Sequence, residues 1–186
     1  MTLIDLGGIA AEPVTLAEAK AWCRIERDDE DGLIARLVTA ARETVERETR
    51  LVLVRRGFRL SLDPVPADGW IEIIRHPLQE VTSVVAYDGA GVPTEFGADA
   101  SVIERALGIE AIRVSQAVVR AAVNGAEIEF TAGFASGTVP QNLLLAMQRI
   151  LATAYELRGA VSAGLQPAIV PEAARALIAP YRRVRL

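Results

Sequence analysis

The sequence predicts an α+β fold, with helical segments in the N-terminal and C-terminal parts packed with a central, mostly antiparallel β-sheet or meander. The period of the hydrophobic residues is one reason: it is helical before residue 50 and after residue 140, and close to two from Leu51 to Thr131. The short connections between the expected strands are another, because they leave no room for crossover helices and so favour antiparallel pairing.

A capping box marks the first expected helix, at about residues 16–24. The Thr15 hydroxyl can accept a hydrogen bond from the amide of Glu18, and the Glu18 carboxylate can accept one from the amide of Thr15. This reciprocal arrangement is typical of a helix N-terminus.

The second expected helix covers about residues 29–49 and begins in the acidic run from Asp28 to Asp31. Negative charge is favoured there because the unpaired amides and the helix dipole carry partial positive charge. Pairs of opposite charge four residues apart, such as Arg42 with Glu46, support the helix. Its apolar stripe consists of Leu33, Leu37, Ala41 and Val45.

Five strands are expected in the centre of the chain, at about residues 52–62, 70–75, 80–87, 111–115 and 127–132. Three dipeptides have the composition of turns between them: Asp63-Pro64, Asp88-Gly89 and Asn124-Gly125. The stretch from Gly97 to Gly108 has no clear pattern.

A third helix is expected at about residues 140–158, with Pro140 in its first turn. Residues 159–170 are uncharged and rich in alanine and glycine, which predicts a flexible joint. A short helix at about residues 172–179 and a basic arm at residues 181–186 follow.

These patterns predict two parts. Residues 1–158 form a single α+β body, and residues 159–186 form a C-terminal segment that contains the joint, the short helix and the arm.

The charge of the chain is distributed unevenly. Residues 1–139 carry 22 acidic and 14 basic side chains, a net charge of −8, whereas residues 140–186 carry six arginines and two glutamates, a net charge of +4. The basic part ends in the arm, which has too few apolar residues to bury itself. Such an arm either lacks a fold of its own or binds a partner, so binding is the first function to consider.

The composition fits a cytosolic globular protein, with 51% hydrophobic residues and one cysteine, Cys23, which cannot form a disulfide within the chain. Residues 1–11 lack the basic start of a secretory signal. The longest uncharged run, Phe130 to Gln148, contains two glycines and a proline, so no membrane association is expected. The net charge of −4 argues against general coating of nucleic acid.

No motif of enzyme chemistry, and so no catalytic residue, metal or cofactor, is expected. His76 is the only histidine, and nothing in its spacing from Cys23 pairs the two as base and nucleophile. A calcium loop that includes Asp28 to Asp31 would place Arg27 at its first ligand position. The four acids would also repel phosphate at the start of a DNA-reading helix.

The alternative to a binding protein is a small α+β enzyme or ligand-binding domain that uses scattered carboxylates and arginines. It requires a concave pocket with a perturbed carboxylate or a bound small molecule.

Several strings, in their order and spacing, resemble the head-tail connector, or adaptor, family of long-tailed bacteriophages and gene transfer agents. They are Pro13-Val14-Thr15-Leu16-Ala17-Glu18-Ala19-Lys20, Pro77-Leu78-Gln79-Glu80-Val81-Thr82-Ser83-Val84 and Phe130-Thr131-Ala132-Gly133-Phe134, followed by Val139-Pro140 and by residues 177–182. The alanine-rich stretch from Gly159 to Ala168 differs from the more polar loop of many relatives.

The resemblance implies a structural virion protein without catalytic residues. Relatives form a ring, commonly dodecameric, on the portal protein and present a platform to the next neck or tail component, a stopper or a tail terminator. DNA passes through the lumen without sequence-specific binding, and an acidic lumen would let it slide. The expected location is the virion neck, after assembly in the host cytoplasm.

The resemblance also implies a docking segment. In relatives the C-terminal segment binds the portal, and the matching residues here are Leu177, Ile178, Tyr181, Arg182, Arg183, Val184, Arg185 and Leu186. Tyr181 and Leu186 can supply apolar anchors, while the arginines can form forked bonds to portal carboxylates or carbonyls.

Overall fold

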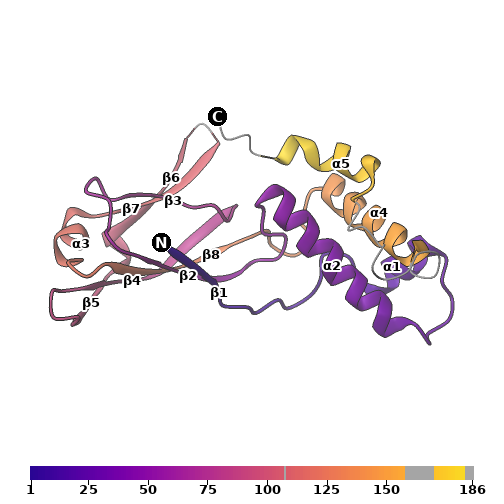
Figure 1. Cartoon of the computed structure of the whole chain (residues 1–186), viewed down its shortest axis with the longest axis horizontal. Coiled ribbons are helices and arrows are strands. Elements are labelled where there is room, and N and C mark those ends of the chain that lie inside the picture. Colours follow the sequence, from indigo (N-terminus) through magenta and orange to yellow (C-terminus); the bar gives the residue numbers. More distant parts are fainter. Residues whose placement is uncertain (107, 158–169, 183–186) are drawn as a thin grey trace. The chain divides into compact units, whose positions relative to one another are not determined.

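The structure, a computed structural model, describes residues 1–106, 108–157 and 170–182 (Figure 1). Its contacts form two compact units. Unit 1 consists of residues 1–9 and 55–133, and unit 2 of residues 10–54 and the chain from residue 134 onward. Residues 55–133 of unit 1 are therefore inserted between the two parts of unit 2, and residues 1–9 of unit 1 precede both parts. The division into a body and a segment from residue 159 stays a prediction, because residues 158–169 lie outside the described residues.

Unit 2 is helical. Its elements are α1 (Leu16–Cys23), α2 (Asp31–Thr49), α4 (Gln141–Leu157), α5 (Glu172–Ile178) and the short 3₁₀ helix η3 (Ala179–Tyr181). The capping box of α1 is present as predicted, with 3.2 Å from the Glu18 amide nitrogen to Thr15 Oγ1 and 2.8 Å from the Thr15 amide nitrogen to Glu18 Oε2. All four α-helices of the described residues of unit 2 match helices predicted from the sequence, within two residues at each described end.

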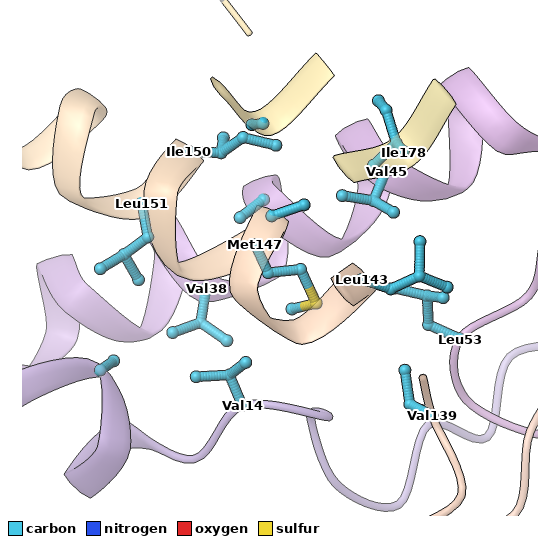
Figure 2. Packing of buried hydrophobic residues seen from close by; sticks show 14 of the residues in the cluster. Val14, Val38, Val45, Leu53, Val139, Leu143, Met147, Ile150, Leu151 and Ile178 are labelled. Carbon is cyan, nitrogen blue, oxygen red and sulfur yellow. The ribbon is translucent and has the colours of Figure 1, made fainter. Parts of the chain in front are cut away.

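The core of unit 2 is formed by the apolar faces of α2, α4 and α5 together with the segments that lead into them (Figure 2). Each large apolar side chain that is fully buried stabilises the fold by about 1.5–3 kcal/mol. The central members, drawn in Figure 2, include Val14, Val38, Val45, Leu53, Leu143, Met147, Leu151 and Ile178.

Unit 1 contains two antiparallel sheets. The five-stranded sheet has the order β1 (Thr2–Asp5), β2 (Arg56–Leu62), β8 (Ala126–Ala132), β4 (Leu78–Tyr87) and β5 (Pro93–Phe96). The three-stranded sheet has the order β3 (Trp70–Glu72), β7 (Ile109–Val114) and β6 (Ser101–Ala106). With the helices of unit 2, these sheets confirm the predicted α+β class and the antiparallel pairing.

Buried and partly buried residues alternate strictly along β2 and β8, so one side of each strand lies in the core of unit 1. Phe58 and Phe130 are cross-strand partners, and their rings stack with centroids 5.7 Å apart. Stacking of this kind contributes about 0.5–1.5 kcal/mol beyond the burial itself. The alternate residues of both strands point to the other face and are only partly buried.

Short elements escaped prediction. They are β1, β5, β6, helix α3 (Gln116–Ala121) and the 3₁₀ turn η1 (Ala98–Ala100). Their sequences have too little periodicity to identify them, whereas the equally short β3 and β7 lie in runs rich in isoleucine and valine. The ambiguous stretch from Gly97 to Gly108 contains η1 and β6.

The strand expected from residue 52 begins only at Arg56. Leu51 and Leu53 are buried in the core of unit 2 instead. The amide of Leu53 donates to Glu46 Oε1 at 2.8 Å, so it is not available to a strand ladder. The apolar run after α2 therefore completes the helical unit before the chain enters the sheet.

The Asn124-Gly125 turn provides a stability test. Gly125 has φ +84°, and a Cβ atom there would lie 2.5 Å from the carbonyl oxygen of Leu62. Gly91 has a similar φ of +80°, but a Cβ atom there would meet nothing within 4 Å. We expect Gly91→Ala to cost about 1–2 kcal/mol from left-handed strain alone. Gly125→Ala should cost at least about 1 kcal/mol more, because the carbonyl must also move.

Chemical denaturation of both variants in a Trp22→Phe background measures this difference, because Trp70 in unit 1 is then the only tryptophan that fluoresces. Equal losses in the free energy of unfolding would mean that the backbone around Gly125 moves to accept the Cβ atom with no further loss of stability.

Candidate partner-binding segment

The C-terminal segment begins with a helix that is part of the core of unit 2. Val170, Ala174 and Ile178 are spaced four residues apart and lie on one face of the segment, and all three are buried. They pack into the same cluster as Leu143 and Met147 of α4 (Figure 2). The helix predicted at residues 172–179 is thus held by tertiary packing rather than by its own propensity.

The residues after α5 continue along unit 2. Leu177 and Tyr181 are partly buried against the core cluster. Arg182 is about half exposed, and its Nη2 atom lies 3.1 Å from Glu48 Oε2 on α2. An ion pair so exposed contributes little to stability. It does, however, place the Arg182 side chain beside α2.

The structure thus divides the eight residues predicted for docking. Ile178 is fully buried, so it cannot contact another protein without leaving the core. Leu177, Tyr181 and Arg182 keep part of their side chains accessible. The remaining four, Arg183, Val184, Arg185 and Leu186, lie outside the described residues. The four-residue spacing from Val170 to Ile178 is the signal in the sequence that identifies Ile178 as a core residue.

Ile178→Ala tests the structural role of α5. Removing a fully buried isoleucine should lower the free energy of unfolding by about 2–5 kcal/mol. Ala179→Ser, one position further and exposed, is the matched control and should change it by less than about 0.5 kcal/mol. Thermal unfolding followed by circular dichroism measures both. A wild-type melting temperature for Ile178→Ala would show that α5 does not belong to the folded core.

The acidic run that precedes α2 is neutralised by neighbouring cations. Lys20 Nζ contacts Asp28 and lies 2.7 Å from Asp31 Oδ1. The hydrogen bond from Lys20 is the main cause of a lowered pKa at Asp28. The run therefore joins α1 to the start of α2. In the part of the chain that the structure describes, no group of three or more His, Cys, Asp or Glu side chains could hold a metal ion.

The same turn is also connected to α4. Arg27 Nη2 lies 2.5 Å from Glu30 Oε2, and the Tyr155 hydroxyl of α4 donates to the same oxygen at 2.5 Å. The hydrogen bond to Glu30 is the main cause of the raised pKa of Arg27. These contacts hold the turn between α1 and α2 against α4.

The single cysteine and the single histidine lie in different units. Cys23 is at the end of α1 in unit 2, and burial, followed by the charge of Glu156, raises the pKa of its thiol. A raised pKa disfavours the thiolate that a nucleophile needs. His76 belongs to unit 1, where it is buried rather than exposed on a loop.

A shallow hollow of about 310 Å³ lies at one end of the five-stranded sheet, lined in part by Asp63, Tyr87 and Glu127. The Glu127 carboxylate accepts hydrogen bonds from the hydroxyls of Ser61 and Tyr87, both at 3.2 Å. These are contacts between adjacent strands, because Ser61 is the cross-strand partner of Glu127. The hollow is therefore the edge of a sheet surface rather than a set of converging catalytic groups.

A long helix with an apolar surface can signal a membrane span. None of the described helices has both the length and the apolar character that a span requires.

Comparison with known proteins identifies what this chain is similar to. Residues 13–86 match the family model for phage gp6-like head-tail connector proteins. No curated protein sequence gave a significant match.

Solved structures resemble the whole chain. A chain in the virion of a native gene transfer agent (GTA) particle is 28% identical with a TM-score of 0.80, and a chain in the neck of an empty GTA particle computed with C6 symmetry is 28% identical with a TM-score of 0.79. A chain in the neck of a native GTA particle computed with C12 symmetry is 25% identical with a TM-score of 0.76. Each alignment covers 100% of this chain and 97% of the other. The predicted resemblance to head-tail connectors is confirmed.

Proposed function

We propose that this chain is a structural connector in the neck of a phage or gene transfer agent particle, where it joins the head to the tail. The observation that carries the proposal is the similarity over the full chain to GTA neck and virion chains, with a TM-score of up to 0.80. The family match at residues 13–86 supports it independently, because it rests on sequence alone. The corresponding location is the head-tail interface of the particle.

Assembly into a ring is the next part of the proposal. Similar chains occur in necks computed with C6 and C12 symmetry, which supports a ring of identical copies. In a closed ring of more than two copies, each copy contacts its neighbours through two unlike surfaces. We therefore assign this chain to a ring, with the dodecamer that the sequence resemblance implies as the expected stoichiometry.

The partners follow from the position in the neck. The portal protein lies on the head side, a stopper or tail terminator lies on the tail side, and DNA passes through the lumen. The charge supports passage without binding, because residues 1–139 carry 22 acidic and 14 basic side chains, a net charge of −8. A surface of this sign repels phosphate within a Debye length of about 8 Å at physiological salt.

The docking arm is tested by a chain that ends at Arg182. This truncation keeps the Arg182 to Glu48 ion pair and every buried residue of α5, so the circular dichroism spectrum and melting temperature should not change. Binding to the portal should fall by about tenfold or more, because Arg183, Arg185 and the apolar anchor Leu186 are lost from every copy. Co-sedimentation with portal rings measures it.

A full-length chain with Arg183→Gln and Arg185→Gln is the matched control for chain length. If it binds like the truncated chain, the arginine charges carry the docking. If both variants bind portal as well as the unaltered chain, the arm is not the docking element.

The enzyme alternative has its own test. Because a connector needs neither the thiol of Cys23 nor the imidazole of His76 for chemistry, Cys23→Ala and His76→Gln should leave assembly intact. A stability loss of about 1–3 kcal/mol is expected where the side chain is buried. Particle assembly and melting temperature measured in parallel separate the two effects. A folded His76→Gln protein that had lost all function would support the enzyme alternative.

A further inference from the structure

Strand β1 differs from the other sheet edges in unit 1. An edge strand exposes unpaired backbone groups, and proteins usually protect it with charges, proline or short length. All four edge strands are short, but β5 begins with Pro93 and carries Glu95, β6 carries Glu104 and Arg105, and β3 carries Glu72. In β1 the only charged side chain is Asp5 at its end.

The carboxylate of Asp5, at the end of β1, already has bonding partners within unit 1. Asp5 Oδ2 lies 2.8 Å from Arg56 Nε of the adjacent strand β2, and Asp5 Oδ1 accepts a hydrogen bond from the amide of Gly7 at 2.9 Å. The carboxylate is therefore directed back into its own unit. It does not protect the free edge against another strand.

Exposed apolar side chains are also concentrated in the segment around β1. Nine large hydrophobic side chains of the described residues are exposed, and four of them lie within residues 1–9. They are Met1 at 68%, Ile4 at 46%, Leu6 at 47% and Ile9 at 37%. Exposed apolar side chains scattered singly need no explanation, but four within nine residues, with Ile4 in the edge strand and the others beside it, mark an interaction site.

The backbone direction shows which groups of β1 are available. The amide of Leu6 donates to the carbonyl of Gly57 on β2 at 3.0 Å. Since successive residues of an antiparallel strand alternate in direction, Ile4 and Thr2 also direct their backbone groups at β2. The N–H and C=O groups of Leu3 and Asp5 then point away from the sheet, along the free edge of β1, the indigo strand beside β2 in Figure 1.

We propose that a neighbouring copy of this chain adds an extended segment to the free edge of β1 when the ring assembles. This inference rests on the proposed function, because the ring supplies the second copy and requires two unlike surfaces on each one. Backbone hydrogen bonds from Leu3 and Asp5 give the contact its affinity, as in other cases of strand addition. Ile4 and Leu6, on one face of the strand, cover the apolar side chains of the added segment.

The side-chain part of the interface is tested with Ile4→Lys combined with Leu6→Lys. Both side chains are about half exposed, so the isolated protein should stay folded, whereas two lysines on a covered edge should weaken ring assembly by about tenfold or more. Val102→Lys combined with Val123→Lys is the matched control, since it adds the same charge at exposed valines of the same unit and should not affect assembly. Sedimentation velocity over a concentration series, with and without portal, measures the effect.

The backbone part is tested by hydrogen exchange on the unaltered protein. The amides of Leu3 and Asp5 should exchange rapidly in the monomer and be protected in the assembled ring. The inference would be overturned if rings formed while both amides stayed unprotected. It would also be overturned if the variant with Ile4→Lys and Leu6→Lys assembled normally. Either outcome would leave the proposed function intact. Protection that appears only when the portal or the next neck component is added would assign the edge to that partner and overturn the second copy as occupant. If the protein neither forms rings nor binds portal, the inference falls together with the proposed function.

Discussion

The two stretches of chain that flank an insertion, residues 55–133 of unit 1, must pack together to form unit 2, and the rest of the fold depends on this closure. The amide of Phe134 donates to the carbonyl of Val52 at 3.2 Å, so the chain leaves and re-enters the helical unit at one point. The core then joins α2, from before the insertion, to α4 and α5, from after it. Because these segments are far apart in sequence, the helical unit can form only when both halves of the chain are present.

A buried charge network links segments of this unit and shows how context changes the meaning of a sequence pattern. Arg42 Nη1 lies 3.2 Å from Glu46 Oε2, and Arg42 Nε lies 2.8 Å from Glu12 Oε2, before α1. Arg42 and Glu46 are nearly fully buried, and Glu46 also accepts the amide of Leu53. Removing one member of such a network leaves a charge without its partner in a dry site, which is costly. The network therefore connects the segments on both sides of α2.

Local signals were enough for the four α-helices described in unit 2 but not for several short elements of unit 1, helix α3 among them. The Thr15 and Glu18 capping box depends on four consecutive residues, so it could be identified without the fold. The Arg42 and Glu46 pair was predicted correctly as an interaction, but its burial depends on Glu12, 30 residues away. Strands as short as β1 and β5 exist because of their neighbours β2 and β4, and no local pattern specifies them.

The features of the candidate site that depend on consecutive residues could likewise be predicted from the sequence. The charge of the arm and the short helix before it can be identified from sequence, whereas the burial of Ile178 depends on α4 and became clear from the packing. The most direct test of the connector function is the mass of the complex formed when purified chain is mixed with portal rings, measured by native mass spectrometry. A connector should add one ring, with twelve copies expected from the C12 symmetry of the similar neck. Portal and chain that remain separate at micromolar concentration, or a chain that forms only dimers, would contradict it.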